Sequence, residues 1–182
     1  LGLTAVRPAS AGIITVTNNT PGNFDASSGT RTVTITGLEA GYGTGVITDV
    51  NVTIDFAKAD GEDPDVLQTG TPFYNELVFS LTRGTTTATV INAGSFNSGD
   101  GPGFTGVITF DDQAAQVVNV DPNLVQAGTF RPVGPDLLGG FNGQLAAGSY
   151  DLFIEDTVGA DSLRFRSFTL TIVTRDLDDG VN

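Results

Sequence analysis

The chain has 182 residues, 39% of them hydrophobic, and its 21 acidic and 8 basic side chains leave a formal net charge of −13. This length suits one domain with a closed hydrophobic core, and the negative charge argues against nucleic acid and anionic membranes as partners, because their recognition requires clustered Lys and Arg. Since Cys and His are absent, a disulfide, a Ser-His-Asp triad, a thiol nucleophile and a conventional zinc site are excluded.

Residues 1–30 are interpreted as an N-terminal extension that contains one β-prone run, IITVT (Ile13 to Thr17). This run can fold back onto the edge of its own sheet. Alternatively, it can be donated to the sheet edge of a second copy, where main-chain hydrogen bonds provide affinity. Repeated head-to-tail donation that does not close yields filaments, so the second alternative predicts self-association into a homo-oligomer or filament.

The rest of the chain shows apolar residues with period two. In DVNVTIDF, Val50, Val52, Ile54 and Phe56 alternate with polar residues, which predicts a half-buried strand. Further strands are expected in RTVTIT, ELVFSLT, TTATVIN, SYDLFIED and SFTLTIV. About nine strands with turns rich in Gly, Pro and Asp predict an all-β fold, a jelly-roll β-sandwich over residues 31–175, followed by an acidic tail at 176–182. No apolar run is long enough to span a membrane.

Three acidic segments are candidate metal sites. The long loop AKADGEDPDVLQTGTPFY holds Asp60, Asp63 and Asp65, but it lacks the EF-hand spacing and is equally well interpreted as a solvated surface loop. The loop also holds the single lysine, Lys58, for which a Ser-Lys dyad is unsupported.

The second segment is Asp111-Asp112, directly after the apolar run of GVITF, and the third is EDTVGADSL with Asp156 and Asp161. Neighbouring carboxylates repel one another, yet they become good ligands around Ca²⁺, which takes six to eight oxygens. The alternative is that each aspartate is a turn residue whose carboxylate accepts hydrogen bonds from backbone N–H groups.

Five segments occur in an order that resembles the P domain of subtilisin-like proprotein convertases and its bacterial relatives. They are ITDVNVTIDF, NELVFSL, GVITFDDQA, GTFRPVGPDLLGGFNGQLAAGSYDLFIED and GADSLRFRSFTLTI. The resemblance as a whole extends from about Arg31 to Val173. The sequence departs from the family pattern in three places: Glu76 stands where Asp is usual, Tyr150 replaces a Trp, and Phe168 is the aromatic residue of the closing strand. No catalytic subtilisin domain accompanies the resemblance.

The resemblance implies an exported, non-catalytic jelly roll that in several relatives binds calcium, with Asp111 and Asp112 sharing a cation with Glu76 and Asp156. The expected function is therefore a secreted, calcium-binding, extracellular or cell-surface structural subunit of prokaryotic type that self-assembles, and not an enzyme. Paired carboxylates could hydrolyse glycosides, but no Trp provides a sugar platform. The alternatives are a module that binds a surface glycan or protein ligand, and an accessory P domain of a larger secreted protease.

Overall fold

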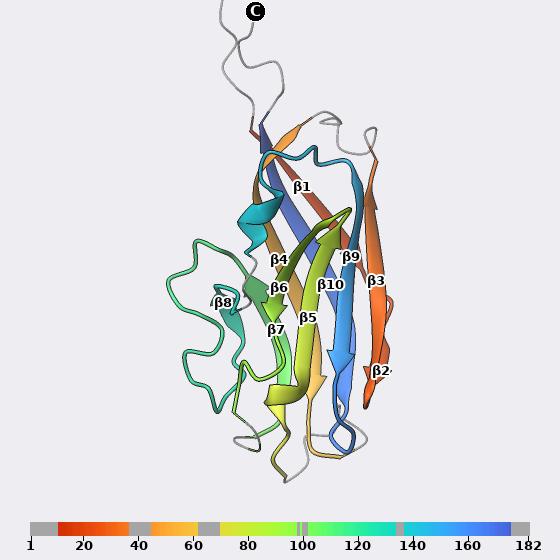
Figure 1. Ribbon diagram of the computed structural model, residues 1–182, viewed down its shortest axis with the longest axis vertical. Helices are drawn as coiled ribbons and strands as arrows, with labels where there is room; N and C mark the ends of the chain where they lie inside the picture. Colours follow the sequence, from red (N-terminus) through yellow and green to blue (C-terminus); the bar gives the residue numbers. More distant parts are fainter. Residues whose placement is uncertain are drawn as a thin grey trace, which may run out of the picture.

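The computed structural model describes residues 11–36, 45–61, 70–97, 99, 102–133 and 137–175, which form two β-sheets packed face to face (Figure 1). Sheet A contains β1 (Ala11–Asn18), β2 (Gly22–Phe24), β4 (Val46–Lys58), β7 (Phe104–Phe110), β8 (Gly128–Phe130) and β10 (Leu163–Arg175). Sheet B contains β3 (Ser27–Ile35), β5 (Leu77–Arg83), β6 (Thr86–Ile91) and β9 (Gly148–Asp156). Two short 3₁₀ helices, η1 (Tyr74–Glu76) and η2 (Leu138–Phe141), lie in the connections.

The strand order confirms the predicted β-sandwich. Sheet A has the order β1-β10-β4-β7-β8, with β2 on part of β10, and sheet B has the order β3-β9-β5-β6. Every pair is antiparallel except β7 with β8. Without the two three-residue strands β2 and β8, eight strands remain, four in each sheet, and the chain passes repeatedly between the sheets as in a jelly roll.

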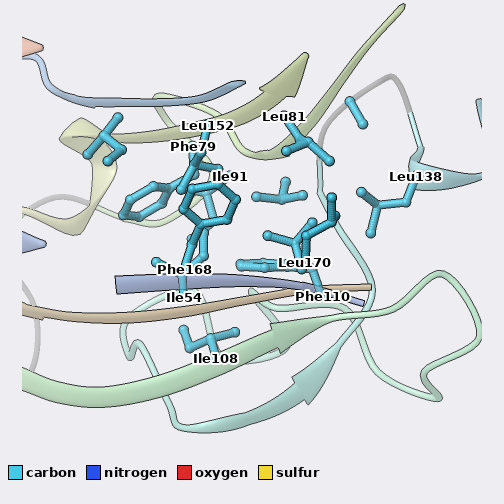
Figure 2. Packing of buried hydrophobic residues seen from close by; sticks show 14 of the residues in the cluster. Ile54, Phe79, Leu81, Ile91, Ile108, Phe110, Leu138, Leu152, Phe168 and Leu170 are labelled. Atoms are coloured by element: carbon cyan, nitrogen blue, oxygen red, sulfur yellow. The ribbon is translucent and has the colours of Figure 1, made fainter. Parts of the chain in front are cut away.

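Alternation along the strands builds the core. In β4 every second residue from Val50 to Lys58 is buried, because successive side chains of a strand point to opposite faces. Figure 2 shows side chains of the two sheets meeting in the space between them, including Phe79, Leu81 and Leu152 from sheet B and Ile54, Phe168 and Leu170 from sheet A.

Local sequence also determines the tightest hairpin. Gly84 and Thr85 are the only residues between β5 and β6, and Gly84 has a φ of +56°. Glycine takes a positive φ without strain from a Cβ, as the first position of a type II′ turn requires.

The run Ile13 to Thr17 lies in β1 and pairs with β10 of the same chain, which is the fold-back alternative. Residues 11–30 are therefore an integral part of the sandwich, with β1 and β2 in sheet A and the start of β3 in sheet B. The acidic tail at 176–182 lies outside the described residues. In the described part of the chain no helix has the length and apolar character to cross a membrane.

Candidate functional site

The only lysine of the sequence, Lys58, is fully buried at the end of β4. The sequence prediction placed it in an acidic loop and was wrong, because β4 extends two residues beyond Phe56 and Lys58 is buried like Phe56. Lys58 is paired with Leu163 of β10 on one side and with Phe104 of β7 on the other. The lysine stem therefore runs through apolar surroundings between two buried neighbours.

Three carboxylates converge on the Lys58 ammonium. Its Nζ lies 2.8 Å from Asp156 Oδ2, 3.0 Å from Asp161 Oδ2 and 3.2 Å from Glu76 Oε2. It also donates to the backbone carbonyl oxygen of Asp161. We call these four residues the Lys58 cluster.

Four different segments supply the Lys58 cluster. Asp156 ends β9, Glu76 ends η1 directly before β5, and Asp161 lies between β9 and β10. The pairing of Leu77 with Asp156 places Glu76 and Asp156 side by side, at the lower end of the sandwich in Figure 1. The backbone N–H of Phe73 donates to Asp161 Oδ2 and fixes that carboxylate. Because Lys58 belongs to sheet A and Asp156 to sheet B, their contact connects the two sheets.

Burial controls the protonation of the Lys58 cluster. It raises the pKa of Glu76 to about 7 and that of Asp156 to about 6, and the ammonium of Lys58 only partly opposes both shifts. For Lys58 itself, burial lowers the pKa, but hydrogen bonds and charge attraction from Asp156 and Asp161 outweigh burial and raise the pKa above 10.5. With three carboxyl groups around one ammonium, the cluster holds an extra proton near neutral pH most readily on Glu76.

One atom of the Lys58 cluster is left without a partner. Asp156 Oδ1 is buried and makes no hydrogen bond of normal geometry within the described part of the structure, although the backbone N–H of Val158 is close enough to lower the Asp156 pKa. A buried carboxylate oxygen without a donor is costly and therefore needs an explanation.

Asp111 and Asp112 lie elsewhere. β7 is antiparallel to β4, with Phe104 opposite Lys58 and Phe110 opposite Val52. Six residues of strand separate these two positions, which is about 20 Å at about 3.3 Å per residue. The two aspartates after Phe110 are thus not brought together with Glu76 and Asp156, although the sequence analysis expected them to share one cation.

Each of these two aspartates accepts backbone hydrogen bonds, the turn alternative considered above. Asp111 Oδ1 accepts from the Gln113 N–H at 2.7 Å, which closes a local turn. Asp112 accepts from Leu138 N–H at 3.3 Å and from Gly139 N–H at 2.7 Å, at the first turn of η2. A carboxylate in this position satisfies N–H groups that a short helix leaves without partners.

The remaining predicted ligands are only partly visible. Asp60 is half-buried just after β4, and Asp63 and Asp65 lie outside the described residues. In the described part of the chain no group of three or more acidic side chains has an arrangement that could hold a metal ion. Where Glu76, Asp156 and Asp161 meet, the ammonium of Lys58 takes the place of a cation, so their geometry does not fit Ca²⁺ there. Calcium binding at other acids stays a prediction.

Comparison with known proteins adds a likeness of fold only. No family model matches the chain, and no curated protein matches it. The crystal structure of FlhE aligns over 91% of this chain and 96% of its own, with a TM-score of 0.42 and 12% identity.

A second similar structure is the complex of the Aeromonas sobria serine protease (ASP) with the chaperone ORF2, which aligns over 90% of this chain with a TM-score of 0.44 and 13% identity. This chain spans 27% of the matched chain. Such values carry no argument about function, and the P-domain resemblance is supported only in its β-rich fold.

Proposed function

We propose that this chain is a secreted, non-catalytic structural module that works as a self-associating extracellular subunit. The supporting observation is the burial of the Lys58 cluster. Carboxyl groups with strongly raised pKa values often mark an active site, but structural ion-pair networks raise them as well. Here the side chains of Lys58, Glu76, Asp156 and Asp161 are only 0%, 8%, 0% and 3% exposed, so a substrate has no access to them. Their role is to hold the two sheets together.

The outer face of sheet A supports a role in assembly. The registers align Thr17, Thr169, Thr53, Thr109 and Thr129 in one row across five strands. Two pairs in this row, Thr17–Thr169 and Thr53–Thr109, are hydrogen-bonded through their hydroxyls at 2.9 Å. These hydrogen bonds fix four hydroxyl groups of the row, as suits a surface against which another subunit packs.

The β1 edge is the proposed contact with a second copy. Within the described residues β1 pairs only with β10, so its other edge lacks a strand partner. On this edge strand Ile13 is 67% exposed, opposite Val173. Unprotected edge strands with exposed apolar residues are templates for pairing with another chain.

The test is light scattering over a range of protein concentrations, with Ile13→Lys as the variant and Val158→Lys as the matched control. Val158 is also an exposed apolar residue, at 52%, but it lies between β9 and β10. We expect the wild type and Val158→Lys to associate and Ile13→Lys to stay monomeric, because a lysine on an edge strand prevents pairing. A wild type that is monomeric at high concentration, or an Ile13→Lys variant that associates equally, contradicts the proposal.

A further inference from the structure

Lys58 and Asp156 form the shortest contact between the ammonium and a carboxylate in the Lys58 cluster. Nζ and Oδ2 are 2.8 Å apart, and both side chains are 0% exposed. An amine held against a carboxyl group in this way is positioned for condensation, since fixed geometry replaces the encounter of two separate reactants. The surroundings exclude water, because Leu77, Phe104 and Leu163 are buried beside the pair.

From this geometry we propose that Lys58 and Asp156 become joined by an amide bond after folding, with Glu76 as the group that relays the proton. The bond links the end of β4 in sheet A to the end of β9 in sheet B. It is an intramolecular, single-turnover reaction and does not depend on the self-association proposed above.

The reaction balances without any further reactant. Nζ of Lys58 transfers a proton to Glu76 Oε2, 3.2 Å away, and the freed lone pair attacks Cγ of Asp156. A C–N bond forms and one C–O bond of the carboxyl group breaks. The departing oxygen takes up two protons that the ammonium held at the start, one of them through Glu76. One water molecule leaves, and Glu76 ends in its initial state.

The unpartnered oxygen of Asp156 is a second, independent observation. The carboxylate has two buried oxygens, and in the described structure Oδ1 makes no hydrogen bond of normal geometry, with only the Val158 N–H in its neighbourhood. An amide has only one oxygen, so condensation removes the surplus acceptor together with two buried charges. The carboxylates around Lys58 keep its pKa above the ordinary value, so the attack requires Glu76 to take the first proton, and removal of water prevents the reverse reaction.

The remaining contacts fit the product. An amide nitrogen keeps one N–H, and the backbone carbonyl of Asp161 already accepts a hydrogen bond from Nζ. Glu76 contacts Nζ as the relay requires. Asp161 is held by the Phe73 N–H and has no part in the bond.

The test is the intact mass of the folded, purified protein, measured under denaturing conditions after prolonged incubation. We expect the wild type to be lighter than its sequence by one water molecule. Lys58→Arg keeps the positive charge without a reactive amine and should show its full sequence mass. Glu76→Gln keeps the shape of the relay but cannot carry the proton, so it should also show its full mass.

Asp55→Asn is the matched control, since Asp55 pairs with Arg166 in a half-exposed ion pair on sheet A. It should lose water as the wild type does. Trypsin locates the bond, because a lysine in an amide is not cleaved. Residues 32–83 should then remain covalently attached to residues 84–164.

A folded wild type with full mass overturns the proposal and shows that the pair is ionic only. Loss of water from Lys58→Arg places the dehydration elsewhere and overturns it as well. Loss of water from Glu76→Gln at the wild-type rate overturns the role of Glu76. A cooperative urea transition of each variant establishes that the protein under test is folded.

Discussion

Replacing Lys58 with methionine tests the electrostatic balance of the Lys58 cluster. Methionine fills a similar volume but has no charge, so Glu76, Asp156 and Asp161 lose the ammonium that contacts all three. Removing one partner of a buried ion pair destabilises a protein by about 3–5 kcal/mol, because the remaining charge is left uncompensated. We expect a loss of this size at pH 8.

The loss should be smaller at pH 5. At pH 5 Glu76 and Asp156 of the folded variant are readily protonated and therefore uncharged. At pH 8 the folded variant must either bury their charges or hold their protons against the pH, and both lower its stability. The ammonium lowers the pKa of both Glu76 and Asp156, so both values rise further when it is removed. At about 1.4 kcal/mol per pKa unit, a further rise of one unit in each makes the loss about 2–3 kcal/mol greater at pH 8 than at pH 5.

Urea unfolding of the wild type and of Lys58→Met at the two pH values measures both quantities. The wild type is taken at its full sequence mass, before condensation, because an amide bond removes the ammonium and the Asp156 carboxyl group on which the pH dependence rests. Arg166→Met is the control for a half-exposed ion pair and should cost at most about 1 kcal/mol. A pH-independent loss from Lys58→Met, or one below about 1 kcal/mol at pH 8, refutes the reasoning.

Further predictions concern Glu76, Asp112 and calcium. Because the folded-state pKa of Glu76, about 7, lies above its ordinary 4.5, the folded protein binds this proton more strongly, and stability should fall as pH rises from about 4 to about 7. Glu76→Gln should flatten that part of a stability–pH profile, and an unchanged slope contradicts the assignment. Asp112→Ala should cost about 1–2 kcal/mol in urea unfolding through loss of two N–H acceptor contacts at η2. Asp121→Ala, which removes one exposed contact, should cost less, and equal losses exclude the capping role. Calcium at 100 times its dissociation constant should stabilise the fold by about 2.7 kcal/mol, and identical melting temperatures in calcium and in chelator rule out binding.

The sequence predicts the architecture well because alternation is a local signal. The period of two from Val50 to Phe56 identifies β4, and the same pattern in SFTLTIV identifies β10. The fate of the β-prone run at Ile13 to Thr17 is not a local property, since the same residues suit an edge of their own sheet or of another chain. The strand order β1-β10-β4-β7 likewise depends on pairing between distant segments.

The candidate site was only partly predictable for the same reason. Lys58 stands two residues after the buried Phe56 of β4, and this spacing is the signal that could have identified its side chain as buried. The acidic residues that follow Lys58 indicated a loop, so the sequence analysis did not assign Lys58 to the strand. Asp111 and Asp112 were grouped with Glu76 and Asp156 by their similar positions at strand ends, but the antiparallel register of β4 and β7 places them at different levels of the sandwich.

The central claim is that the single lysine is sealed between the two sheets. The most direct measurement is labelling with an amine-reactive acylating reagent, with the modified positions located by peptide mass spectrometry. Because Lys58 is the only lysine, its label is distinguished from that of the terminal amine without further variants. The account predicts no label on Lys58 in the native protein. Labelling that appears in urea shows an ionic contact, and resistance even in urea shows the amide bond. Rapid labelling of Lys58 in the native, folded protein contradicts the burial on which the whole account rests.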